Sequence, residues 1–148
     1  MKMNAASIKN QKAEWEALGV KLPAFDHEAM TAKTKEHPVW VHFGAGNIFR
    51  GFIAGLQQRL LNAGLAESGI VAAETFDYDI IDKIYVPHDS MTLMVSLKAD
   101  GSTQKEVIAS IAKGIKANCA DEAQWQQLTD VFTAPSLQMA SFTITEKG

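Results

Sequence analysis

A short apolar segment that runs straight into a glycine-rich turn constrains the fold more than any other part of the chain. Residues 39–43 contain no Asp, Glu, Lys or Arg, which is typical of a buried parallel strand. Gly44-Ala45-Gly46 follows at once, and the next residues carry apolar side chains at helical spacing. A strand, a turn whose glycines let the backbone approach a ligand, and a helix N-terminus with free N–H groups together suit a nucleotide pyrophosphate.

Strand and helix patterns alternate along the rest of the chain. Helices are predicted over residues 7–18, 47–63, 78–85 and 121–132, and strands over residues 39–43, 70–73, 91–97, 103–111 and 137–145. The turn at residues 99–102 indicates that the two strands beside it pair as an antiparallel hairpin. Residues 33–38 are polar and end in proline, which indicates a linker. We expect an α/β fold: a Rossmann-like parallel sheet with flanking helices and one β-hairpin insertion.

The helix after the glycine turn has the strongest amphipathic pattern. Apolar side chains recur every fourth residue, at Ile48, Phe52, Leu56 and Leu60. Three polar side chains are set to the other side: Arg50, Gln57 and Gln58. This spacing predicts that the apolar stripe faces the core and that the polar side faces water.

Composition argues against several classes of function. The 148 residues carry a formal net charge of −3, so a nucleic-acid surface is not expected. No apolar run approaches the length of a membrane span, and Cys119 is the only cysteine, which excludes an internal disulfide. The four histidines show no metal-ligand spacing. We expect a cytoplasmic protein with no metal, membrane or nucleic-acid partner.

The turn departs from the common G-x-G-x-x-G pattern, because Phe49 stands at the third glycine position. Gly44 is suited to the tight turn, and Gly46 is suited to close approach of a phosphate. Arg50, in the first turns of the helix, gains nothing from the helix dipole, so a nearby phosphate or carboxylate would explain it. The alternatives are a tight turn that binds no ligand and a solvated surface arginine.

Two carboxylates follow the second predicted strand, where an acid can accept both ribose hydroxyls of an adenosine. Glu74 lies 30 positions after Gly44, and Asp77 lies 33 after it, compared with the usual spacing of about 20. Either carboxylate would repel a 2′-phosphate, which favours NAD over NADP. The alternative is that either residue only caps the helix that follows.

Residues 44–53 resemble the cofactor loop of the polyol-specific long-chain dehydrogenase (mannitol dehydrogenase) family. Residues 23–26, 88–93 and 141–148 also resemble segments of that family, in the same order. The resemblance implies that the loop lines the pyrophosphate of NAD, through Gly44, Gly46, Asn47, Ile48 and Arg50. It implies a ribose ligand at Glu74 in one branch of the family or at Asp77 in another, and it places Thr145 near the nicotinamide.

The resemblance also implies an NAD-dependent oxidoreductase. The substrates implied are a keto sugar acid and a sugar acid, such as fructuronate and mannonate, with mannitol, mannitol 1-phosphate or tagaturonate and altronate as alternatives. The chain is expected to hold an N-terminal helix and connector over residues 1–38 and part of an NAD-binding Rossmann domain over residues 39–148.

The catalytic residues of the family are expected outside this chain. The family's signature is a lysine, an asparagine five positions later and a histidine four positions after that. Lys113 and Asn118 match its first two positions, but Glu122 stands at the third, so we interpret the match as coincidence. A C-terminal catalytic domain of the same enzyme is then the expected partner, and the chain alone is expected to bind little cofactor and to catalyse nothing. The alternative is a non-catalytic nucleotide-binding module.

Overall fold

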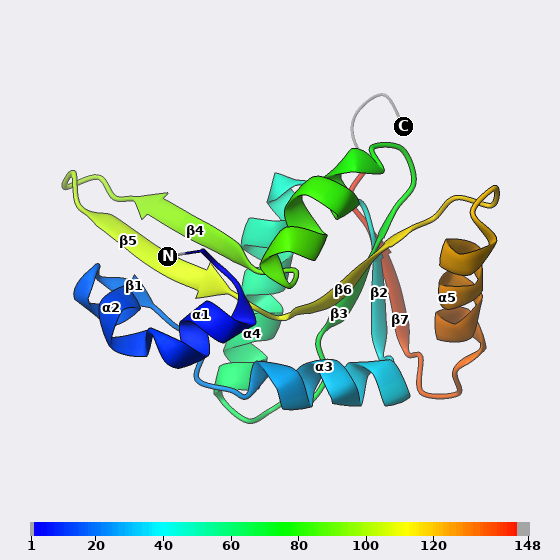
Figure 1. The fold of residues 1–148 in the computed structure, drawn as a ribbon, viewed down its shortest axis with the longest axis horizontal. Helices are drawn as coiled ribbons and strands as arrows, with labels where there is room; N and C mark the ends of the chain where they lie inside the picture. The colour runs from blue at the N-terminus through cyan, green and yellow to red at the C-terminus, as the bar shows by residue number, and fades with distance from the viewer. Residues whose placement is uncertain (1, 145–148) are drawn as a thin grey trace.

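Four parallel strands form the central sheet of the computed structural model, which describes residues 2–144. The strands are β2 (Trp40–Phe43), β3 (Ile70–Glu74), β6 (Ile111–Lys116) and β7 (Met139–Phe142). Their order across the sheet is β6-β3-β2-β7, so the chain builds outward from β2 on one side and then returns to its other side (Figure 1). This order places a topological switch point between β2 and β7. The predicted Rossmann-like fold is confirmed.

Helices cover both faces of this sheet. A π-helical segment, η1 (Phe49–Ile53), leads into α4 (Ala54–Asn62), and both pack on one face with η2 (Ile81–Tyr85). On the opposite face, α5 (Glu122–Thr133) buries Leu128 and Val131 against the strands. Since both faces are covered, β3 is buried along its whole length, and its first four residues are apolar.

The predicted hairpin forms a second, smaller sheet. β4 (Thr92–Leu97) and β5 (Thr103–Ile108) pair antiparallel and extend away from the central sheet in Figure 1. β1 (Val20–Lys21) joins β5 in parallel. A separate core beside this sheet includes Trp15 and Met91, and it is covered by the N-terminal helices α1 (Ala5–Asn10) and α2 (Lys12–Ala17). A short 3-10 turn, η3 (Val86–His88), connects η2 to the hairpin.

Several local predictions were wrong. The helix expected over residues 7–18 forms as α1 and α2, with a break at Gln11. Most of the expected linker at residues 33–38 belongs to α3 (His27–Glu36), whose N-terminus is capped by Asp26 accepting from the Ala29 N–H at 3.0 Å. β6 was not predicted at all, and the strand expected over 103–111 ends at Ile108.

Along η1 and α4, which together form the predicted helix, the buried face is the reverse of the predicted one. Gln58 is only 1 % exposed, whereas Phe52 is 64 % exposed and Ile48 is 70 % exposed. The Gln58 amide explains the reversal: its nitrogen donates to Val107 O at 2.7 Å, and its oxygen accepts from the Ala109 N–H at 2.6 Å. These two bonds satisfy backbone groups between β5 and β6, so a polar side chain is more favourable there than an apolar one.

Candidate functional site

The glycine turn lies at the carboxyl ends of the parallel strands, beside the switch point. Gly44 has a φ of +104°, and its N–H donates to Ala73 O on β3 at 2.9 Å. A Cβ at this position would lie 2.5 Å from Thr143 Oγ1, just beyond the end of β7. Gly44 is therefore needed both for its backbone conformation and for the close approach of the chain after β7.

The next residues present unpaired backbone donors. Within residues 2–144, the N–H groups of Gly46, Asn47 and Ile48 have no hydrogen-bond acceptor. A Cβ at Gly46 would meet nothing within 4 Å, so the space above the turn is open. Open space in front of free N–H groups at the start of a helix fits an anionic group such as a pyrophosphate.

Arg50 lies one turn into the helix. Its guanidinium donates to the side-chain oxygen of Asn47, and its Nε is buried with no partner among the described residues. Burial raises the pKa of the nearby Tyr85 hydroxyl, and the positive charge of Arg50 acts in the opposite direction. A cation beside the open turn adds positive potential where the N–H groups point.

Glu74, at the end of β3, is directly bonded to the turn. Its Oε2 accepts from the Ala45 N–H at 2.8 Å, and its Oε1 accepts from the N–H groups of Thr75 and Phe76, each at 3.0 Å, and of Asp77 at 3.3 Å. The residue is 9 % exposed. The carboxylate thus accepts from four backbone donors at once.

Asp77 differs from Glu74 in both burial and hydrogen bonding. Its residue is exposed, and its carboxylate accepts no hydrogen bond from residues 2–144. The two acids that the sequence could not separate therefore have different environments, one buried and bonded to backbone, the other open to solvent. Thr145, the remaining predicted site residue, lies outside the described residues.

His42, on β2, was not predicted as part of the site. Its ring is fully buried, stacks on Phe49 at 4.2 Å, and lies 2.7 Å from Ser141 Oγ and 3.1 Å from Thr143 Oγ1. These contacts link β2 to the β7 side of the switch point. Burial lowers the pKa of His42 to about 4, so the ring is neutral at pH 7. Nothing in the sequence alone indicated its partners, which lie about 100 residues away.

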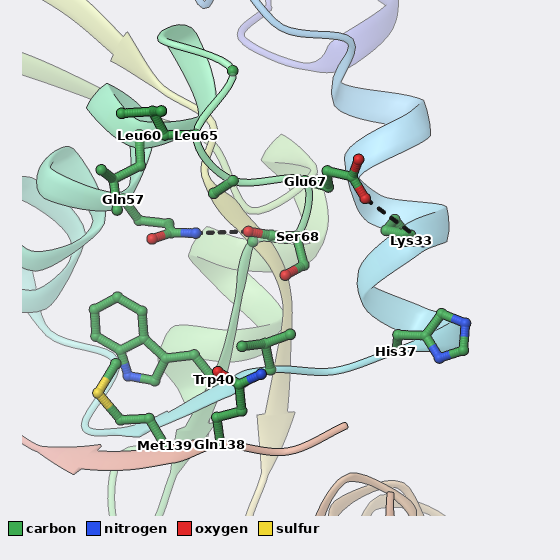
Figure 2. Close-up of a pocket in the computed structure, with 14 residues that line it drawn as sticks. Lys33, His37, Trp40, Gln57, Leu60, Leu65, Glu67, Ser68, Gln138 and Met139 are labelled. Carbon is green, nitrogen blue, oxygen red and sulfur yellow. Dashed lines mark hydrogen bonds and ion pairs between the residues drawn. The ribbon is translucent and has the colours of Figure 1, made fainter. Parts of the chain in front are cut away.

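A cavity of about 800 Å³ lies at the opposite end of the sheet, near the amino ends of the strands. Figure 2 shows its wall: Trp40 and Met139 lie on one side, and Leu60 and Leu65 lie across from them. Two polar contacts lie in this wall: Lys33 pairs with Glu67 at 3.6 Å, and the Gln57 amide donates to Ser68 O at 2.7 Å. The cavity is spacious, but it lies away from the carboxyl ends of the strands, where ligands bind in open parallel sheets.

Residues 2–144 hold neither a metal-binding cluster nor a membrane-spanning helix. No group of three or more His, Cys, Asp or Glu side chains in this part of the chain could hold a metal ion. No helix within the same residues is long and apolar enough to cross a membrane. Lys113, the first residue of the coincidental catalytic spacing, lies on β6 and donates to Gln127 Oε1 at 3.2 Å.

A parallel sheet of this order, with a glycine turn and open N–H groups at its switch point, defines the class of Rossmann-type nucleotide-binding domains. Curated relatives and a solved structure support the resemblance of the chain to the mannitol dehydrogenase family. It is 46% identical over all 148 residues to D-mannonate oxidoreductase of Thermotoga maritima. It is also 27% identical over 111 residues, 73% of the chain, to altronate oxidoreductase of Halalkalibacterium halodurans. No family model matches the chain.

Solved structures have the same fold. Mannitol 2-dehydrogenase of Pseudomonas fluorescens, in a complex with NAD and D-mannitol, matches the whole chain with a TM-score of 0.78 and 25% identity. A D-sorbitol dehydrogenase matches 99% of the chain with a TM-score of 0.75 and 22% identity. The chain spans 27% and 21% of the lengths of the two curated relatives, and 27% and 28% of the two solved chains.

Proposed function

We propose that this chain is the cofactor-binding portion of an NAD-dependent oxidoreductase that interconverts fructuronate and mannonate. The observation that carries the proposal is 46% identity to D-mannonate oxidoreductase over all 148 residues. The weaker likeness to altronate oxidoreductase supports a sugar acid as the substrate class. Tagaturonate and altronate, or mannitol and its 1-phosphate, are the alternative substrates.

NAD is the proposed cofactor, and the turn fits it. The pyrophosphate would lie over Gly44 and Gly46, in reach of the free N–H groups of Asn47 and Ile48 and of the Arg50 guanidinium. The likeness to a mannitol 2-dehydrogenase solved with NAD supports this choice. When bound, the nicotinamide supplies or accepts the hydride.

A carboxylate after β3 would bind the adenosine ribose. Asp77 is better suited than Glu74, since its carboxylate is exposed and free of bonds to the described chain, whereas that of Glu74 is buried and engaged. Asp77 would accept from the ribose hydroxyls and repel a 2′-phosphate, which would favour NAD over NADP. Thr145 is proposed to lie near the nicotinamide, by resemblance alone.

A C-terminal catalytic domain of the same enzyme is the proposed partner. The chain covers 27% of D-mannonate oxidoreductase. Apolar side chains along η1 and α4 are open to solvent, namely Ile48, Phe52, Leu56 and Leu60. An apolar surface of this kind favours coverage by further protein. We place the enzyme in the cytoplasm, where the exposed thiol of Cys119 would stay reduced.

The test uses the purified full-length protein. We expect NADH to bind, as measured by its fluorescence, and to be oxidised on addition of fructuronate. If NADH were oxidised with tagaturonate, fructose or fructose 6-phosphate but not with fructuronate, the substrate would be one of the alternatives. Binding of NADH with no turnover of any of these substrates would contradict the proposed activity and leave a nucleotide-binding module.

A further inference from the structure

Both backbone polar groups of Ala45, the residue between the two glycines of the turn, are hydrogen-bonded to side chains. The Ala45 N–H donates to Glu74 Oε2 at 2.8 Å, and Ala45 O accepts from the Tyr85 hydroxyl at 3.0 Å. Ala45 is fully buried and Tyr85 is 2 % exposed, so both bonds lie in a dry environment where they are strong. Glu74 comes from the end of β3 and Tyr85 from η2, so two separate elements fix one residue of the turn.

The conformation of Ala45 decides where the open donors point. Gly46 and Asn47 follow it directly; their N–H groups have no acceptor among residues 2–144, and a Cβ at Gly46 would meet nothing within 4 Å. A rotation of the Ala45 peptide would turn these groups away from any ligand above the turn. Fixing them in advance lowers the cost of ordering the loop when a ligand binds.

The carboxylate of Glu74 has little capacity left for a ligand. Both of its oxygens already accept from backbone, and four N–H groups offset its charge. This matters because an unpaired carboxylate at this place would repel a pyrophosphate. Glu74 is therefore suited to support the turn without opposing the anion.

We infer that Glu74 and Tyr85 are positioning residues that clamp Ala45 and so orient the pyrophosphate donors of the turn, rather than ligands of the ribose. This inference rests on the proposed function, because it takes a dinucleotide as the ligand above the turn. It predicts that loss of the clamp weakens the affinity for NADH and the affinity for NADPH by the same factor, since both dinucleotides carry the same pyrophosphate.

The experiment compares Glu74→Gln, Tyr85→Phe and Asp77→Asn in the full-length protein. In Glu74→Gln the amide oxygen can replace Oε1, but the amide NH2 then faces the Ala45 N–H, so the bond to the turn is lost. We expect dissociation constants about tenfold weaker for NADH and NADPH alike. Tyr85→Phe removes the second bond without changing the packing, and a loss of about threefold is expected for both ligands. Asp77→Asn should change the ratio between the two ligands instead.

Hydrogen exchange provides a readout that needs no ligand. Amides of residues 44–50 should exchange faster in Glu74→Gln and Tyr85→Phe, and at the wild-type rate in Asp77→Asn. If Glu74→Gln changed the ratio of the affinities for NADH and NADPH, Glu74 would be a ribose ligand, and the inference would be overturned. Unchanged exchange and affinity in Tyr85→Phe would overturn it as well, even if Glu74→Gln fails to fold. If the wild type binds neither dinucleotide, the proposed function fails, while exchange still tests the clamp.

Discussion

The two ends of the central sheet differ in what they offer a ligand. The amino end has a cavity of about 800 Å³, in which Lys33 pairs with Glu67 and the Gln57 amide donates to Ser68 O. The carboxyl end has an open turn with free N–H groups and an arginine, supported by buried bonds from Glu74 and Tyr85. Volume alone would favour the amino end, whereas the glycine turn at a helix start and the Arg50 guanidinium favour the carboxyl end for an anion. The carboxyl end is also where ligands bind in open parallel sheets.

Substituting one glycine at each end, Gly44 and Gly64, should give the largest difference in stability and in NADH affinity. Gly44→Ala puts a Cβ 2.5 Å from Thr143 Oγ1 at a φ of +104°, so we expect a loss of about 3 kcal/mol of stability and no measurable NADH binding. The matched control is Gly64→Ala at the cavity, where φ is also positive, at +68°, but no atom lies within 4 Å.

Gly64→Ala should cost only about 1 kcal/mol and leave the affinity for NADH unchanged. Thermal melting and NADH titration of both variants provide the measurement. Equal losses in the two variants would mean that the close contact at Gly44 has no effect beyond its backbone strain.

The next effect concerns the buried histidine at the carboxyl end. The pKa of His42 is about 4 in the folded protein and about 6.5 in an unfolded chain, so between these values the unfolded state binds the extra proton. Stability should therefore fall as the pH falls below 6.5, by about 2 kcal/mol between pH 7 and pH 5.

Urea unfolding of the wild type and of His42→Gln at pH 7 and pH 5 measures this effect. Glutamine can keep hydrogen bonds to Ser141 and Thr143 but cannot titrate, so its pH dependence should be smaller. The remaining histidines contribute equally to both proteins. An identical pH dependence in the two proteins would exclude His42 as the cause.

The elements around the carboxyl end were predictable from the sequence because their signals are local. Strands β2 and β3 carry no charged residue before Glu74, and Gly44 and Gly46 stand between a strand and a helix. The resemblance of residues 44–53 to one family's loop needed no structure either. Local sequence patterns were therefore enough to predict the turn and the order of the first elements.

Long-range contacts decided what the sequence did not predict. Gln58 is buried because it bonds backbone groups some 50 residues away, which reverses the expected face of α4. β6 contains Lys113 and Gly114, which weaken its strand pattern, and a Cβ at Gly114 would lie 2.8 Å from Ile81 Cδ1. Glu74 and Asp77 could not be separated, since only the folded turn brings the Ala45 N–H to one of them.

A small effect is expected from the ion pair at the amino end. Lys33 and Glu67 are 3.6 Å apart, and both side chains are largely exposed. Glu67→Gln should therefore cost less than about 1 kcal/mol, as measured by thermal melting at low salt. The affinity for NADH should stay within twofold of the wild type, and a larger change would mean that the cavity takes part in binding.

Gly46→Val tests most directly whether the turn at the carboxyl end binds the dinucleotide. The protein leaves open space at this position, so a valine should not disturb the fold, but its side chain would occupy the place proposed for the pyrophosphate. For the full-length protein we predict a melting temperature close to that of the wild type and an NADH affinity weakened at least tenfold. An unchanged NADH affinity in the folded variant would contradict the account and leave the turn as a strand-to-helix connection without a ligand.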